Sequence, residues 1–177
     1  MFVPVLIESC TEWFERGGTQ PPFNIDTFTL TLERTSNTLP EQTTSFTPKK
    51  YQFVIRPVRK QTVHNKKQMH RRHGTMAAHA DQAPARAVET VESFTITSNA
   101  GLMTSDVDTY PAGTSLNDIF FGSDAFVRNE ELFETGYSLR PQFSVWKAQT
   151  HQFTFSINLS DGRVFDLHSE TYDLLPD

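Results

Sequence analysis

A run of large apolar residues at every second position most constrains how this chain can fold. The run spans residues 152–169, on both sides of Asp161-Gly162, and its apolar members are Phe153, Phe155, Ile157, Leu159, Phe165 and Leu167. Successive side chains of a strand point to opposite faces, so the spacing predicts two strands that each bury one face. Asp-Gly tolerates positive φ and forms tight turns. The pattern therefore predicts an antiparallel hairpin over residues 152–169.

Shorter runs of the same kind predict further strands. They lie at residues 27–34, 51–55, 91–97 and 138–146. Pro57 is expected to end the second of these strands or to confine it to a sheet edge, because proline has no N–H to donate. Residues 35–48 are rich in Thr, Ser, Asn and Pro and are expected to form a long turn or loop.

Helical signals are few and short. One helix is expected at residues 8–16, and one or two helical turns at residues 116–122, between a capping hydroxyl at Thr114 or Ser115 and the terminal Gly122. No regular alternation of strands and helices is visible, which disfavours doubly wound nucleotide-binding folds. The fold is predicted to be mainly β, with antiparallel β-sandwich or barrel-like domain(s), one or two short helices and a long basic arm.

Phenylalanine is expected to fill the core, since the chain has 15 Phe among its 177 residues. A chain of this length buries roughly 70% of its unfolded surface and needs no disulfide or metal to fold. Its one cysteine, Cys10, cannot form an internal disulfide and is expected to be a small core residue. The first residues do not resemble a signal peptide, and no segment approaches the roughly 20 apolar residues of a membrane span. We therefore expect synthesis in the cytoplasm and no membrane partner.

The charges of the chain are unevenly distributed. No Asp or Glu occurs between Glu41 and Asp81, where nine of the 16 Lys and Arg and four of the six His are found. The nine basic residues are Lys49, Lys50, Arg56, Arg59, Lys60, Lys66, Lys67, Arg71 and Arg72. The rest of the chain has 16 − 9 = 7 basic and 21 acidic residues, a balance of −14. A basic segment within an acidic chain is suited to an acidic partner.

Residues 59–88 are expected to form a basic, His-rich arm. From Arg59 to Ala87 the only large apolar side chains are Val63, Met69 and Met76. These are too few to offset the entropy that ordering the segment would cost. The segment is therefore expected to be mobile in the free protein.

The arm divides the chain into an N-terminal β segment with a short helix, residues 1–58, and a C-terminal β domain, residues 89–177. The pattern leaves open whether the two β parts form one domain. Binding to an acidic partner is assigned to the basic residues in and beside the arm: Arg56, Arg59, Lys60, Lys66, Lys67, Arg71 and Arg72. That partner could be nucleic acid or the acidic remainder of a neighbouring copy. The alternative is a solvated loop without a partner.

No motif predicts catalysis or a cofactor. His70 and His73 are three residues apart, but their neighbours are cations, which oppose a metal ion. Two pairs of acids lack the spacing of a calcium loop and are interpreted as solvated: Asp106 with Asp108, and Asp118 with Asp124. The sequence has no glycine-rich phosphate loop and no nucleophile elbow. We expect a non-enzymatic protein without metal, cofactor or small-molecule substrate.

One part of the chain resembles a known class of proteins. The resemblance is carried by Tyr-Pro-Ala-Gly-Thr-Ser-Leu at 110–116, Glu-Thr-Gly-Tyr-Ser-Leu at 134–139 and the strands at 143–162. Together, residues 110–167 resemble β modules in virion structural proteins of tailed phages, such as head fibres and capsid decoration proteins. The resemblance implies a β-rich assembly protein without an active site, located in the virion after synthesis in the host cytoplasm. It implies further copies of itself and other virion proteins as partners.

Two other functions stay open at the level of the sequence. A nucleic-acid-associated protein would use the basic arm, although residues 59–87 hold no Phe, Tyr or Trp on which bases could stack. A carbohydrate-binding or adhesive β domain would use the tyrosines and Trp146. Salt-dependent retention on DNA would favour the first, and glycan binding by the C-terminal part would favour the second.

Overall fold

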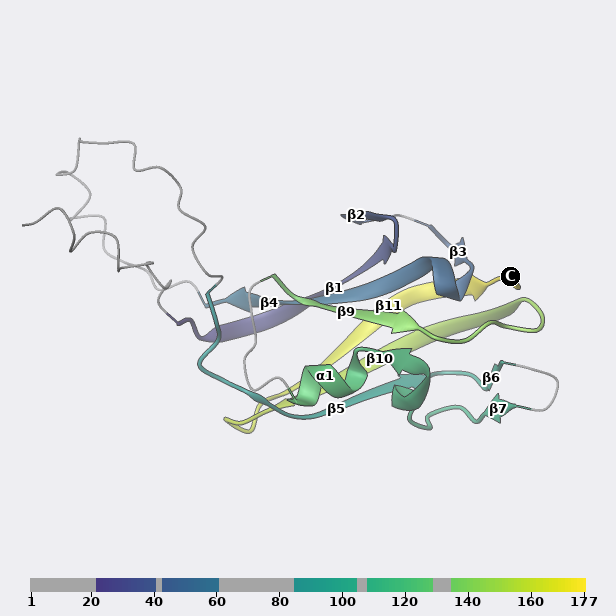
Figure 1. The fold of residues 1–177 in the computed structure, drawn as a ribbon. Coiled ribbons are helices and arrows are strands. Elements are labelled where there is room, and N and C mark those ends of the chain that lie inside the picture. The colour runs from purple at the N-terminus through teal and green to yellow at the C-terminus, as the bar shows by residue number, and fades with distance from the viewer. Residues whose placement is uncertain (1–21, 41–42, 61–84, 105–107, 129–134) are drawn as a thin grey trace, which may run out of the picture.

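The computed structural model describes residues 22–40, 43–60, 85–104, 108–128 and 135–177 (Figure 1). Its strands are β1 (Ile25–Arg34), β2 (Asn37–Pro40), β3 (Ser45–Phe46), β4 (Tyr51–Arg59), β5 (Val91–Ser98), β6 (Leu102–Met103), β7 (Thr109–Tyr110), β8 (Phe120–Phe121), β9 (Tyr137–Pro141), β10 (Gln149–Leu159) and β11 (Val164–Leu174). The short helical segments are η1 (Pro48–Lys50), η3 (Asn117–Ile119) and α1 (Ser123–Arg128). The prediction of a mainly β, antiparallel fold with little helix is confirmed.

The strands form two main sheets that pack face to face. One sheet has the order β2-β1-β4-β9-β8 and the other β3-β11-β10-β5, while β6 and β7 form a small separate pair. Among the described strands only the β3–β11 pairing is parallel. The Phe53 ring of β4 lies 5.5 Å from Phe153 and 5.0 Å from Phe155 of β10, measured between ring centroids. The two sheets therefore bury a shared aromatic layer, as in a β-sandwich.

Strands from both sides of the predicted arm contribute to each sheet. In the first sheet β4 pairs with β9, with Phe53 opposite Leu139. In the second, β3 pairs with β11. A further bridge joins Phe23 to Ala87. The two β parts, left open as one domain or two, thus share both sheets and one core.

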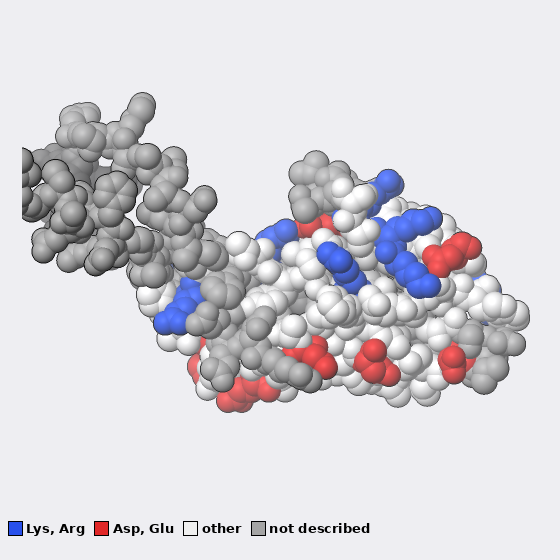
Figure 2. Space-filling view, in the orientation of Figure 1, with Lys and Arg blue, Asp and Glu red and all other residues white. Residues whose placement is uncertain are grey.

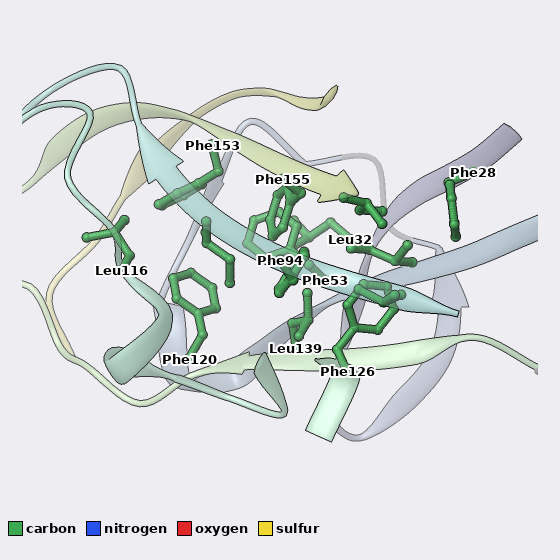
Figure 3. Packing of buried hydrophobic residues seen from close by; sticks show 14 of the residues in the cluster. Phe28, Leu32, Phe53, Phe94, Leu116, Phe120, Phe126, Leu139, Phe153 and Phe155 are labelled. Carbon is green, nitrogen blue, oxygen red and sulfur yellow. The ribbon is translucent and has the colours of Figure 1, made fainter. Parts of the chain in front are cut away.

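Phenylalanine fills this core, as predicted (Figure 3). The rings of Phe53, Phe126, Phe153 and Phe155 are among the largest fully buried side chains. Many of the rings meet edge to face, a favoured arrangement for aromatic pairs. In one such pair, the ring centroids of Phe94 and Phe126 lie 4.7 Å apart. Burying one such side chain contributes roughly 1.5–3 kcal/mol. The core is therefore the main source of stability.

The predicted hairpin is present as β10 and β11. Phe155 lies opposite Leu167, and Ile157 opposite Phe165, in an antiparallel register. Gly162 has φ +85° at the turn, a conformation that glycine adopts without strain. The strands extend beyond the predicted residues 152–169, to Gln149 at one end and Leu174 at the other.

The segment at 35–48 and the strand at 51–55 differ from the prediction. The expected loop contains β2, which pairs with β1 after a tight turn, and β3, which lies beside β11. β4 continues through Pro57 to Arg59 instead of ending there. Its pairing with β9 stops at Ile55, so Pro57 has a strand partner on one side alone, where it lies opposite Phe28. The missing N–H of proline is tolerated at such a position.

The predicted helical turns at 116–122 were also wrong in their bounds. A single turn, η3, is followed by β8, and α1 begins only at Ser123. Asn117 explains the difference, because its side chain binds the backbone of β5. Its Oδ1 accepts from Ile96 N at 2.8 Å, and its Nδ2 donates to Phe94 O at 2.7 Å. Asn117 thus joins η3 to β5, and the next residues, Phe120 and Phe121, pair with β9 as a strand instead of continuing a helix.

The other predicted elements differ from the structure in their bounds or lie outside the described residues. The strand expected at 138–146 ends at Pro141 as β9. The bounds of the arm expected at 59–88 were wrong at both ends, because Arg59 belongs to β4 and Ala85 and Ala87 are buried in the core, while residues 61–84 lie outside the described residues. The helix at 8–16, Cys10 and the arm residues Lys66, Lys67, His70, Arg71, Arg72 and His73 lie outside the described residues.

Candidate functional site

Four cations come together at one end of the five-stranded sheet, and we call them the cationic patch: Arg34, Lys49, Lys50 and Arg140. Arg34 ends β1, the two lysines form η1, and Arg140 lies on β9. Thr35 ties these elements, since its N and Oγ1 both donate to Lys50 O, at 3.0 and 3.2 Å. The largest group of Lys and Arg side chains in Figure 2 lies in this part of the molecule.

Arg140 is held in a fixed orientation. Its Nε donates to Gln52 Oε1 at 3.0 Å, and Gln52 itself is only 5% exposed. None of the described residues forms a hydrogen bond with its two terminal nitrogens. An exposed guanidinium held by one nitrogen presents the other two as a fork for an acidic group.

A shallow pocket of about 360 Å³ lies at the centre of the patch, lined by Thr35, Lys49, Arg140, Pro141 and Gln142. Two of its five lining residues are cations, and two more have polar side chains. A carboxylate or phosphate placed here would receive charged hydrogen bonds from both cations. The chemistry of the pocket is therefore that of an anion-binding site.

The patch already holds one carboxylate of the chain itself. Lys49 Nζ lies 3.5 Å from Asp177 Oδ2, and the Ser144 hydroxyl donates to the same carboxylate. The hydrogen bond from Ser144, followed by the charges of Lys49 and Lys50, lowers the pKa of Asp177. An acidic side chain is thus stabilised in its charged form at this surface.

Arg56, predicted to bind an acidic partner, forms an ion pair within the sheet. Its Nη2 donates to Glu33 Oε1 at 2.8 Å and its Nη1 to Thr31 Oγ1 at 3.0 Å. Glu33 is 1% exposed. A buried carboxylate needs such a partner, because an isolated buried charge is strongly destabilising. Arg56 therefore stabilises the fold.

The remaining predicted residues fall into two groups. Arg59 and Lys60 lie at the far end of β4 from η1, where the Arg59 guanidinium sits 4.9 Å from the centroid of the Phe23 ring. Lys66, Lys67, Arg71 and Arg72 lie outside the described residues. Arg34 and Arg140 were missed by the sequence interpretation, because they lie outside the acid-free window and only strand pairing brings them to η1.

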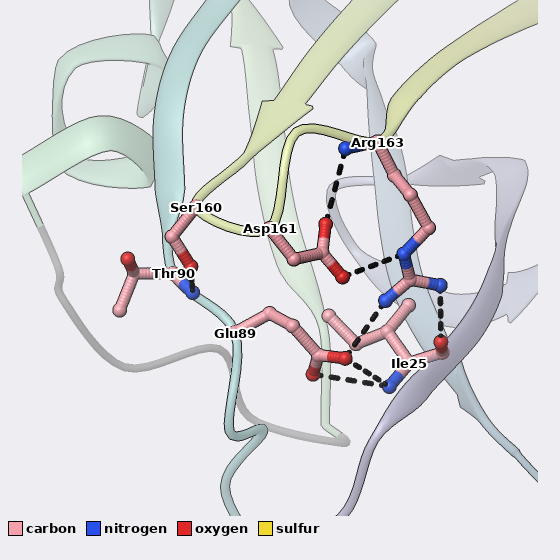
Figure 4. A network of polar contacts seen from close by, with 6 residues as sticks. All are labelled: Ile25, Glu89, Thr90, Ser160, Asp161 and Arg163. Carbon is pink, nitrogen blue, oxygen red and sulfur yellow. Dashed lines mark hydrogen bonds and ion pairs between the residues drawn. The ribbon is translucent and has the colours of Figure 1, made fainter.

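A second ion-pair network lies at the hairpin turn (Figure 4). Arg163 donates to Glu89 Oε1 at 2.7 Å, to Asp161 Oδ2 at 2.7 Å and to Ile25 O at 2.6 Å. Glu89 in turn accepts from Ile25 N at 3.2 Å. Arg163 thus joins three parts of the chain: Ile25 of β1, Glu89 just before β5, and Asp161 in the turn between β10 and β11. Like Arg56, Arg163 uses its charge inside the protein.

A buried serine–histidine pair resembles a nucleophile with its base. Ser98 Oγ lies 2.8 Å from His151 Nδ1, and the two residues are 4% and 1% exposed. Burial lowers the pKa of His151, which keeps the imidazole neutral. Neither side chain is accessible to a substrate, so the pair links β5 to β10 within the core.

The chain matches no protein-family model, and comparison found no matching curated protein and no matching solved structure. Its function is therefore inferred from its own residues.

Four further acids are exposed, and we call them the acidic edge: Glu92, Asp108, Asp118 and Asp124. They belong to β5, the residue before β7, η3 and α1. In Figure 2, Asp and Glu side chains line the lower part of the visible face. Part of this edge adjoins the patch, because Phe121 of β8 lies opposite Arg140 of β9. Partial burial raises the pKa of Tyr110, and the charges of Asp118 and Asp108 raise it further.

The structure brings together one of the two acid pairs that were interpreted as solvated. Asp118 and Asp124 both line a hollow of about 290 Å³, which also includes Phe121. The Phe121 side chain is 65% exposed. The other pair is not described in full, since Asp106 lies outside the described residues. The acidic edge therefore combines carboxylates with an exposed aromatic ring.

The residues that the structure describes lack two kinds of feature. They contain no group of three or more His, Cys, Asp and Glu that could hold a metal ion. No helix among them is long and apolar enough to cross a membrane.

Proposed function

We propose that this chain is a non-enzymatic structural protein of a virion, which joins neighbouring subunits through charged surfaces of its β-sandwich. The observation that carries the proposal is the cationic patch, in which cations from β1, η1 and β9 gather around a pocket suited to a carboxylate. Exposed acids of the same face lie next to it, since Phe121, which shares a hollow with Asp118 and Asp124, is opposite Arg140 in the β8–β9 pairing (Figure 2). Complementary charged surfaces give specificity and orientation to protein assembly.

The contrast between Arg140 and the arginines that form internal ion pairs supports this proposal. Glu33 and Glu89, the two buried carboxylates among the described residues, are both paired with arginines that hold strands together. The patch differs, since the terminal nitrogens of Arg140 point to no described acceptor. The resemblance of residues 110–167 to β modules of tailed-phage virions adds the virion as the place of assembly. The implied partners are further copies and other virion proteins.

Mass spectrometry of purified particles tests the proposal. Particles from cells that produce the virus should contain this chain at a fixed ratio to a capsid or tail protein. The double variant K49E/R140E should be incorporated less than K60E, which reverses a charge at the other end of β4. Absence of the chain from purified particles would contradict the proposal.

Trp146 favours a second candidate function, the binding of carbohydrate. Its side chain is 61% exposed. Aromatic rings that face solvent can pack on sugar rings through their apolar faces. Quenching of tryptophan fluorescence by glycans, lost in Trp146→Ala, would support this function over the first.

A further inference from the structure

His151 lies in a chain of hydrogen bonds that runs through the interior of the protein. The residue is 1% exposed, and its Nδ1 lies 2.8 Å from Ser98 Oγ of β5. Its Nε2 lies 3.3 Å from Oε1 of Gln149, two residues earlier on β10. Both ring nitrogens of this buried imidazole therefore have partners, and a second proton would have to fit into these contacts.

The contacts of Gln149 determine which ring nitrogen of His151 carries the proton. Gln149 Oε1 accepts from Met103 N at 2.8 Å, and Gln149 Nε2 donates to Met103 O at 2.6 Å. A backbone N–H can only donate and a carbonyl can only accept, so the amide group of Gln149 cannot be turned around. Its Oε1 atom can only accept from His151. The proton of the neutral imidazole thus lies on Nε2.

The Ser98 hydroxyl completes the chain of hydrogen bonds on the other side of the ring. With the proton on Nε2, the Nδ1 atom of His151 accepts from Ser98, whose oxygen accepts from Ala100 N at 3.4 Å. A second proton, on Nδ1, would point at the Ser98 oxygen and force the hydrogen of that hydroxyl to turn away. The hydrogen bonds are therefore satisfied only around a neutral imidazole.

The surroundings of His151 offer no counter-ion for a charged ring. Tyr172 of β11 lies opposite it, with a phenol that is neutral in acid, and the Phe153 ring stacks beside it at 6.0 Å between centroids. Burial alone lowers the pKa of His151, whereas a facing carboxylate would raise it. The acids of the neighbouring elements are all exposed: Glu92 of β5, Asp108 before β7, and Glu170 and Asp173 of β11.

The β6–β7 hairpin is attached to the sandwich through this chain of hydrogen bonds. Its two strands have two residues each and form a sheet of their own, apart from the two main sheets. A two-stranded hairpin is only marginally stable by itself. Both backbone groups of Met103 bind Gln149, and Leu102 is fully buried. With so few contacts, the hairpin is expected to open before the main sheets do.

We propose that His151 is a pH-sensitive switch, which keeps the β6–β7 hairpin on the sandwich while its imidazole is neutral and releases the hairpin when the imidazole is protonated. A charged imidazole without a counter-ion is strongly destabilising in the interior and must reach water. Opening of the hairpin admits that water and breaks the contact with Gln149. This inference goes beyond the proposed function and does not depend on it.

The direction of the pH effect follows from the two states of His151. In the open state the imidazole is in water and has an ordinary pKa of about 6.5, whereas burial lowers the pKa in the closed state. Below about pH 6.5 the open state therefore binds a proton that the closed state does not, and the closed state loses stability. The equilibrium constant for opening should rise by up to about 30-fold between about pH 7.5 and about pH 5.

Amide hydrogen exchange of the full chain, followed by NMR, tests the switch. After correction for the intrinsic pH dependence of exchange, the N–H of Met103 should exchange about tenfold faster or more at about pH 5 than at about pH 7.5. Ile96 is the matched control, because its N–H also donates to a side-chain amide oxygen at 2.8 Å, that of Asn117. Exchange at Ile96 should change little. Nitrogen chemical shifts of His151 should show a neutral ring with its proton on Nε2.

Two variants assign the effect to the imidazole of His151. His151→Gln keeps a polar side chain without a titratable group, so exchange at Met103 should lose its corrected pH dependence. His168→Gln removes an exposed histidine that contacts Thr154, and it should behave like wild type. Thermal melting checks that both variants fold. Should His151→Gln fail to fold, wild-type exchange and the imidazole shifts still decide the question.

The outcomes that contradict the switch are distinct. An imidazole that titrates near pH 6.5 in the folded protein, or that carries its proton on Nδ1, would overturn the inference. Equal acceleration at Met103 and Ile96 would overturn it too, because acid would then unfold the sandwich as a whole. A pH dependence that persists in His151→Gln would belong to another group. Absence of the chain from virions would refute the proposed function and leave the switch intact.

Discussion

Arg56 and Arg140 lie on neighbouring strands of one sheet and use their charges in different ways. Arg56 donates two hydrogen bonds, one of them to the buried carboxylate of Glu33. Arg140 donates only to the neutral amide of Gln52 among the described residues. The comparison shows that a cation's role follows from what strand pairing places opposite it. Its position in a basic stretch of sequence does not decide that role.

The largest expected effect is a loss of stability when Arg56 is replaced. Arg56→Ala should leave Glu33 charged and nearly without solvent, and it should lower the free energy of unfolding by about 3 kcal/mol. Urea denaturation followed by circular dichroism measures the loss. Adding Glu33→Gln to Arg56→Ala should restore part of the stability, because it removes the buried charge. Equal stability of Arg56→Ala and wild type would mean that the ion pair between Arg56 and Glu33 does not stabilise the fold.

Gly136→Ala should give the next largest loss, about 2 kcal/mol. A Cβ at Gly136 would lie 2.5 Å from Arg56 Cγ and 2.7 Å from Ile55 O, and the residue has φ +85°. The substitution therefore strains the backbone and displaces the side chain that neutralises Glu33. Thermal unfolding of Gly136→Ala, alone and combined with Arg56→Ala, measures the effect. A smaller loss in the Arg56→Ala background would show that part of the cost passes through Arg56.

Gly162→Val serves as a comparison for Gly136→Ala, because a side chain at Gly162 would have no close neighbours. Gly162 has the same φ of +85°, but a Cβ there would meet nothing within 4 Å. The cost should be that of backbone conformation alone, about 1 kcal/mol or more for a β-branched residue. Its melting temperature should therefore fall less than that of Gly136→Ala. A larger fall would show that turn conformation outweighs the contact with Arg56.

The hairpin could be predicted because both of its strands and its turn are adjacent in the sequence. Phe155 and Leu167 alternate with polar residues, and Asp161-Gly162 marks the turn between them. The pairing of β4 with β9 could not be predicted, because period-two patterns identify strands but not their neighbours. The mainly β class was therefore accessible from the sequence, and the sheet order was not.

The residues of the candidate site could not be predicted for the same reason: a local sequence pattern does not show which strands pair. The acid-free window includes Lys49 and Lys50, which were not assigned to the predicted site, and it includes Arg56, which was assigned but whose partner Glu33 lies on another strand. Arg140 lies far outside the window, and no local pattern distinguishes it from other surface arginines. A patch assembled from β1, η1 and β9 becomes visible only when the sheet is known.

The smallest expected effect on stability belongs to Arg140→Ala. Arg140 is exposed, and its lost partner is the neutral acceptor Gln52 Oε1 on a side chain that is 5% exposed, so we expect a loss of only about 0.5–1 kcal/mol. Association measured by sedimentation should nevertheless weaken, since the pocket loses one of its two cations. Arg56→Ala, with its large loss of stability, provides the opposite case. If Arg140→Ala destabilises the fold as much as Arg56→Ala, both arginines are structural and the distinction between them is wrong.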